Sequence, residues 1–131
     1  MATITEDYVS FETAKLLKEK GFNEQCRDFY RQENENWLHR NTYEYNYFNL
    51  QIPIWKDCYA CPTIQMACKW LREVHNINID IVSVWNQKRF EYQVFVVTPE
   101  NAKHCYIDDK LYIDYKEACV TAIKYCLTNL I

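Results

Sequence analysis

The sequence predicts an α+β fold with a mainly antiparallel sheet and about three helices packed on one face. Three observations support this prediction: capped amphipathic segments, alternating or β-branched runs between them, and polar turns that join those runs as hairpins. The expected order of elements is α-β-β-α-β-β-β-α. A chain of 131 residues is close to the commonest domain size, so we expect residues 1–131 to form a single domain.

Three helices are expected from their start and stop signals. The first begins after the N-cap Ser10 and ends at Gly21, the only glycine in the sequence. The second starts near Pro62, and its apolar residues have the spacing of one buried helical stripe: Ile64, Ala67, Trp70, Leu71 and Val74. The third follows Asp114, which completes a capping box with Glu117.

The stretch between the first two helices predicts strands followed by a loop. Residues 24–31 and the residues after the polar turn at 33–36 form a predicted hairpin. In residues 43–47, Tyr alternates with Glu and Asn, which places three tyrosines on one face of a strand. Residues 51–62 are expected to form a loop within the domain, because prolines stand at its flanks and apolar residues between them.

The stretch before the last helix predicts three strands. Residues 77–85 begin with isoleucines in alternation, and residues 90–97 are β-branched and aromatic enough for a central strand. Residues 105–107 and 111–113 flank an Asp-Asp-Lys turn, which predicts a second hairpin.

Charge and composition exclude several classes of partner. The formal charge is −3 with acids and bases interspersed, so the chain lacks the basic surface that binds double-stranded nucleic acid. The apolar runs are too short to span a membrane. The first residues lack the basic and apolar regions of a secretory signal, so we expect a cytoplasmic protein.

The cysteines offer one motif that could carry chemistry. Their number, seven, is odd and no export signal accompanies them, which favours reduced thiols. Cys58 and Cys61 have the spacing of two zinc ligands or of a redox pair that opens a helix. A zinc site needs two further ligands, which would have to come together through the fold: Cys68, His75, His104 or Cys105.

Other catalytic classes lack the residues that they need. A single glycine excludes the phosphate-binding loop and the dinucleotide fingerprint. The two serines, Ser10 and Ser83, do not lie in a nucleophile elbow. We therefore assign no catalytic residue and no cofactor, and we expect a binding protein rather than an enzyme.

Aromatic residues suggest where a partner could bind. The chain has 11 tyrosines, a residue that is enriched where surfaces are buried against partners. Tyr43, Tyr45 and Tyr47, together with Trp55, are the candidate contact surface. The alternative is that this face packs under the helices of the domain.

Three segments carry a resemblance. Residues 7–22, 62–75 and 122–131 resemble small uncharacterised proteins encoded by gut-bacterial genomes and their phages or integrated elements. The resemblance covers about a third of the chain and implies an accessory phage or mobile-element protein, with no known activity or functional residue.

These observations predict a small binding or interaction protein. It would bind a protein partner or associate with itself, through the tyrosine-rich surface or through an edge strand. The alternative is a metal-binding or thiol-redox protein that uses Cys58 and Cys61.

Overall fold

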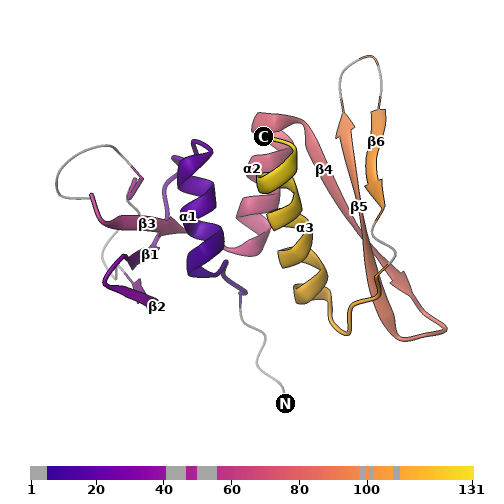
Figure 1. The fold of residues 1–131 in the computed structure, drawn as a ribbon, viewed down its shortest axis with the longest axis horizontal. Coiled ribbons are helices and arrows are strands. Elements are labelled where there is room, and N and C mark those ends of the chain that lie inside the picture. The colour runs from indigo at the N-terminus through magenta and orange to yellow at the C-terminus, as the bar shows by residue number, and fades with distance from the viewer. Residues whose placement is uncertain (1–5, 41–46, 50–55, 98–99, 101, 108–109) are drawn as a thin grey trace. The chain divides into compact units, whose positions relative to one another are not determined.

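The computed structural model describes residues 6–40, 47–49, 56–97, 100, 102–107 and 110–131 (Figure 1). Within these residues lie helices and antiparallel sheets, which confirms the predicted α+β class. The chain divides into two compact units, Met1–Gln65 and Met66–Ile131, and each has a three-stranded sheet of its own. The sequence predicted one sheet, whereas the described residues form two. That residues 1–131 form a single domain stays a prediction.

In the first unit, helix α1 (Phe11–Glu19) has the ends that the sequence predicted. The backbone amide of Thr13 donates to the Ser10 hydroxyl at 3.3 Å, so Ser10 is the N-cap. Gly21 has a φ of +93°, and the amide of Phe22 donates to the carbonyl of Leu17 at 2.9 Å. This is the Schellman ending, in which a residue without Cβ takes the left-handed conformation.

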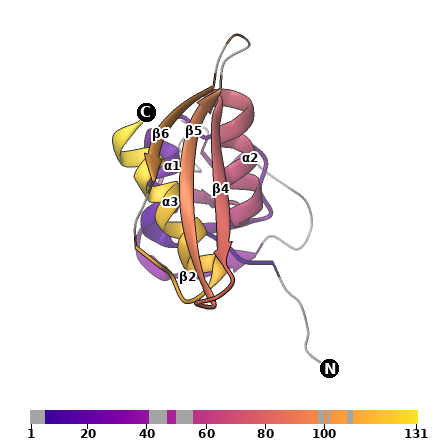
Figure 2. The same cartoon turned by 90° about the vertical axis from the view of Figure 1, so that its right-hand side faces the viewer.

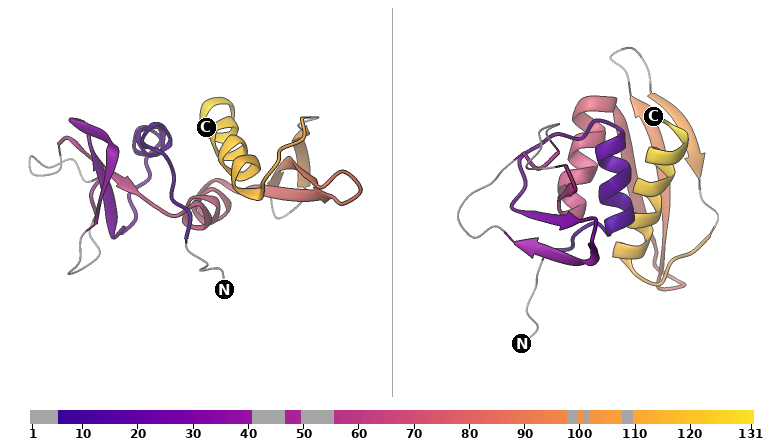
Figure 3. Two further views of the ribbon diagram at one scale, coloured as in Figure 1. Left: turned by 90° about the horizontal axis from the view of Figure 1, so that it is seen from below. Right: turned by 60° about the vertical axis from the view of Figure 1, so that its left-hand side comes forward.

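The sheet of the first unit has the order β2-β1-β3 and is antiparallel throughout. Its strands are β1 (Asp28–Arg31), β2 (Asn34–Arg40) and β3 (Cys58–Cys61). The predicted hairpin is therefore present, while the loop predicted over residues 51–62 is wrong at its end. Strand β3 forms because β1 offers it a second hydrogen-bonding edge, and α1 contacts this strand (Figure 3).

The second unit contains most of α2 (Ile64–His75), β4 (Ile77–Val84), β5 (Arg89–Val97), β6 (Ala102–Ile107) and α3 (Tyr115–Asn129). Its sheet has the order β4-β5-β6 and is antiparallel. Helices α2 and α3 lie behind the sheet in Figure 2, which looks onto the opposite face. The amide of Glu117 donates to the Asp114 carboxylate at 2.7 Å, which confirms the predicted start of α3.

The second predicted hairpin is replaced by pairing with β5. Strand β6 pairs with residues 93–97 of β5, and Tyr112 forms an isolated antiparallel bridge with Phe90 near the beginning of β5. Both arms of the expected hairpin therefore bond to β5. A strand of nine residues is long enough to pair with them one after the other.

The apolar patterns of the predicted helices and strands place six residues in the core, and the structure largely confirms them: Leu17, Trp70, Leu71, Val94, Val96 and Ile123. Leu17, Leu71, Val94 and Ile123 are fully buried and Trp70 is 5% exposed, whereas Val96 is half-buried. Val74 was expected on the buried stripe of α2, but it is 54% exposed because it lies in the last turn of the helix, beyond the covered residues.

We predict that Ile123→Ala lowers the free energy of unfolding by about 2 to 5 kcal/mol, because it leaves a cavity at a fully buried position. Val74→Ala is the matched control, since it removes an exposed β-branched side chain from the other helix and should change stability by about 0.5 kcal/mol or less. Urea unfolding of the two variants measures the difference. Equal effects would mean that the assignment of the core is wrong.

Candidate functional site

The two thiols of the predicted metal or redox motif lie in a strand. Cys58 and Cys61 are the first and last residues of β3, and both are 1% exposed. Side chains three positions apart in a strand point to opposite faces of the sheet. The Cys61 thiol lies 3.4 Å from the carbonyl oxygen of Val9, to which it donates. The charges that act on Cys58 are different ones, those of Arg31, Lys18, Asp57 and Glu33. The two sulfurs therefore do not face a common point.

Burial also makes these thiols poor nucleophiles. Burial raises the pKa of Cys61 to about 12, and that of its neighbour Cys26 also to about 12. Burial raises the pKa of Cys58 too, although Arg31 and Lys18 partly oppose this shift. A thiol with a raised pKa is protonated at neutral pH and reacts slowly. The environment of β3 is thus that of structural cysteines.

Polar groups around β3 have structural partners. The Tyr30 hydroxyl donates to the carbonyl of Val9 at 2.8 Å, and burial raises its pKa. The amide of Ala60 donates to the Asn49 side chain at 2.9 Å, and Asn49 in turn donates to the carbonyl of Phe22 at 2.7 Å. These bonds tie β3 to the segments that flank α1.

Among the described residues, the side chains that could provide the two further zinc ligands do not form a metal site. Cys68 is half-buried on α2, and its electrostatic neighbour is Cys119 of α3. His75 ends α2 with its ring 4.7 Å from that of Trp70. The side chains of His104 and Cys105 lie outside the described residues. No group of three or more His, Cys, Asp or Glu among the described residues is arranged to hold a metal ion.

The predicted tyrosine-rich surface falls mostly outside the described residues. Tyr43, Tyr45 and Trp55 lie there, and nothing in the structure tests them. Tyr47 is described and is 43% exposed. The contact surface therefore stays a prediction.

A different set of apolar side chains lies on the segments at one end of the second unit, around the turn that joins β4 to β5. Trp85 begins this turn and is 84% exposed, and Ile113 and Tyr115 are 70% and 49% exposed. The rings of Phe90 and Tyr115 are 6.0 Å apart with their planes at 88°, so the aromatic edge of one meets the face of the other. We call Trp85, Phe90, Ile113 and Tyr115 the hairpin-end patch.

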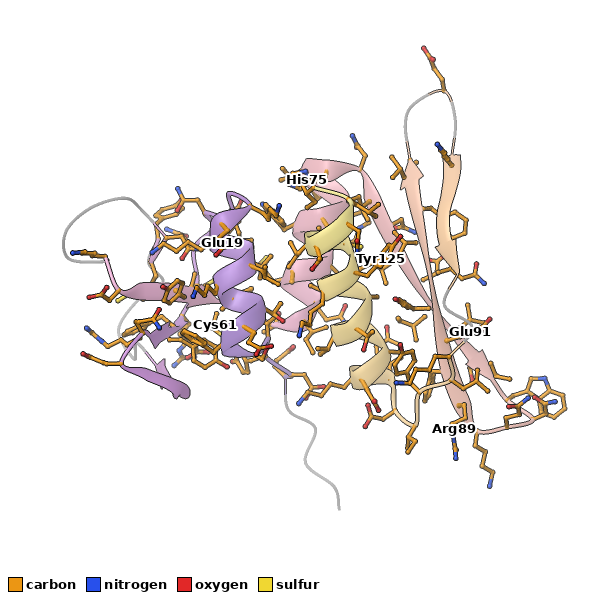
Figure 4. All side chains as sticks on the ribbon, in the orientation of Figure 1. Glu19, Cys61, His75, Arg89, Glu91 and Tyr125 are labelled. Atoms are coloured by element: carbon orange, nitrogen blue, oxygen red, sulfur yellow. The ribbon has the colours of Figure 1, made fainter. Side chains whose placement is uncertain are left out.

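Backbone bonds hold the hairpin-end patch in place. The amides of Phe90 and Tyr112 each donate to the other residue's carbonyl, at 2.9 and 2.7 Å, which fixes the segment that carries Ile113 beside β5. Arg89 donates to the carbonyl of Lys88 at 3.0 Å and braces the turn, and Figure 4 shows Arg89 at this end of the hairpin. The patch thus lies on a hydrogen-bonded turn, on β5, on the segment before α3 and on the first residue of α3.

Three lysines lie on the same segments as the hairpin-end patch. Lys88, Lys110 and Lys116 are exposed, and the ammonium group of Lys110 lies 5.4 Å from the centre of the Tyr112 ring. An apolar centre with a charged rim is the usual composition of a protein-binding surface. The sequence analysis did not predict this patch because the alternating pattern assigns Trp85 to the end of a strand. A tryptophan next to a polar turn was the available signal.

Comparisons of the chain with protein-family models, with curated proteins and with solved structures found no match. Within the described residues, none of the helices combines the length and the apolar character needed to cross a membrane.

We predict that Cys26, Cys61 and Cys68 react with a thiol reagent at about pH 8 at least a hundredfold more slowly in the folded protein than in the unfolded chain. Burial raises each pKa from 9.0 to about 12, so little thiolate is present in the folded state. Mass spectrometry of labelled peptides measures each site. After denaturation without reductant, seven thiols should react. Fast labelling of Cys61 in the folded protein would contradict the buried environment of β3.

We also predict that stability falls as the pH rises above 9. These three thiols ionise near pH 9.0 when the chain is unfolded and near pH 12 when it is folded. Between these values the unfolded state loses protons that the folded state keeps, so the free energy of unfolding falls by up to about 1.4 kcal/mol per pH unit and thiol. Melting temperatures at about pH 8 and pH 10 measure the effect. Cys26→Ala should reduce the slope, and an unchanged slope would contradict its cause.

Proposed function

We propose that this chain is a protein-binding domain that contacts its partner through the hairpin-end patch. The exposure of Trp85 carries the proposal, because 84% exposure is costly for so large an apolar side chain unless a partner covers it. Tryptophan and tyrosine are the residues that most often dominate binding energy in protein interfaces. The partner is another protein or a second copy of this chain. The resemblance of three segments favours an accessory role in a phage or mobile element.

The structure of the hairpin end suits this function. A hydrogen-bonded turn carries Trp85, strand β5 carries Phe90 and the first turn of α3 carries Tyr115, while Ile113 follows Tyr112, which is bonded to β5. Little ordering is therefore needed when a partner binds. The tyrosine-rich segment with Trp55 is a second proposed contact surface, and the exposure of Tyr47 agrees with it.

The alternative function, metal binding or thiol-redox chemistry through Cys58 and Cys61, rests on the spacing of these two residues alone. The strand places these two sulfurs on opposite faces, and burial raises both pKa values. Elemental analysis that found about one zinc per purified chain would overturn this ranking.

We predict that Trp85→Ser weakens partner binding about thirtyfold or more, which corresponds to about 2 kcal/mol for a central interface residue. The test cross-links tagged protein in an extract of its host, identifies the captured protein and measures its affinity for each variant. Val74→Ser is the matched control, because Val74 is also exposed and apolar but lies on α2. Circular dichroism should show that both variants are folded. Equal binding by wild type and Trp85→Ser would reject the hairpin-end patch as the contact surface.

A further inference from the structure

Strand β4 presents an open edge. Among the described residues it pairs with β5 alone, so it lies at one end of the sheet order β4-β5-β6. It is eight residues long, pairs without a bulge, and contains no lysine, proline or glycine. Lysines, prolines, bulges and short length are the features that usually prevent an edge strand from pairing with another chain. Strand β4 has none of them.

Two other edges described in the structure, those of β6 and β3, are protected. Strand β6 is shorter, contains the exposed Lys103, and meets β5 across a bulge between Val94 and Phe95. In the first unit, Asn49 accepts the outward amide of Ala60 on β3. Strand β4 has no comparable protection among the described residues, apart from the charge of Asp80.

The register shows which backbone groups of β4 point outward. The amide of Val97 donates to the carbonyl of Asn76 at 2.7 Å, and bonded and non-bonded pairs alternate in an antiparallel ladder. The even-numbered residues of β4 therefore bond to β5, and the odd-numbered ones direct their amides and carbonyls to the open edge. The hydrogen bonds of Phe90 agree with this assignment, because its amide and carbonyl bond to Tyr112 and not to β4. Ser83, the residue opposite Phe90 on β4, therefore directs its own amide and carbonyl to the open edge.

The sequence of β4 is complementary to itself in the antiparallel direction. Residues 77–81 read Ile-Asn-Ile-Asp-Ile, which is nearly symmetric about Ile79. When two copies pair about a two-fold axis at Ile79, isoleucine lies opposite isoleucine on the helix-facing side. On the other side, Asn78 of each copy lies opposite Asp80 of the other. These two side chains already form a hydrogen bond within one chain, at 3.2 Å, so their groups are compatible.

The charge of Asp80 selects this register. If the axis passed through Asp80, the two carboxylates would lie directly opposite each other in a non-bonded pair, where side chains are closest and like charges destabilise the sheet. When the axis passes through Ile79, the outward amides and carbonyls of Ile77, Ile79 and Ile81 all form hydrogen bonds with the second copy. Each cross-strand pair of side chains then stabilises the joined sheet.

We infer that the open edge of β4 pairs with β4 of a second copy of this chain, antiparallel and centred on Ile79, so that the two sheets join into one continuous sheet. This inference rests on the proposed protein-binding function and names a second copy as the partner at an edge distinct from the hairpin-end patch.

Amide hydrogen exchange of the wild-type protein, at low micromolar and near-millimolar concentration, tests the inference. The amides of Ile77, Ile79 and Ile81 should exchange at least about tenfold more slowly at the high concentration, because dimers protect them. The amides of Asn78, Asp80 and Val82 are internal controls, since they bond to β5 in the monomer and are protected at both concentrations. Free exchange of the odd-numbered amides at the high concentration would overturn the inference.

A pair of variants gives a second measurement. Ile79→Pro removes one outward amide and should be monomeric by sedimentation at concentrations where wild type and Ile79→Ala are dimers. A dimer formed by Ile79→Pro would overturn the pairing, and if this variant does not fold, hydrogen exchange of the wild type decides. A wild-type dimer whose odd-numbered amides exchange freely would refute the β4 pairing and leave the proposed function intact. The proposed function fails separately, if Trp85→Ser binds its partner like wild type.

Discussion

The need of strand β5 for hydrogen bonds on both sides organises the second unit. Strand β5 is the central strand of the order β4-β5-β6, and its alternate residues Tyr92 and Val94 are buried on the face that α3 contacts. A buried backbone cannot leave its amides and carbonyls without partners. Strand β4 supplies them along one edge, and β6 together with Tyr112 supplies them along the other. The open edge of β4 and the hairpin-end patch both follow from this arrangement.

The helices could be predicted because their signals are local. Ser10, Gly21 and Asp114 act on groups within a few residues, and each has the bonding that its position in the sequence indicates. The pairing of strands is not local. Residues 58–61 became a strand only because β1 lies beside them, and residues 111–113 bonded to β5 rather than to the nearer 105–107. Hydrophobic patterns identify strands but do not state which strands meet.

The candidate site shows the same limit. The spacing of Cys58 and Cys61 suits a metal or redox site when the chain turns or opens a helix between them, but in a strand it separates the two side chains. The exposure of Trp85 was missed because an apolar residue at the end of an alternating run is normally assigned to the core, and the polar turn beside it was given too little weight. Whether a side chain packs against a helix or extends beyond the end of the sheet depends on the tertiary fold.

Helix α2 has a consequence for how the chain can be divided. The boundary between the two compact units falls between Gln65 and Met66, inside the first turn of this helix. The amide of Ile64 donates to the carbonyl of Asp7, so that the beginning of the helix belongs to the first unit and its remainder to the second. A circular permutation, a split reporter or an inserted tag placed at this boundary would interrupt a helix at its nucleating turn. The two halves are thus joined by a shared element of secondary structure instead of a linker, and fragments made there would each lack part of it.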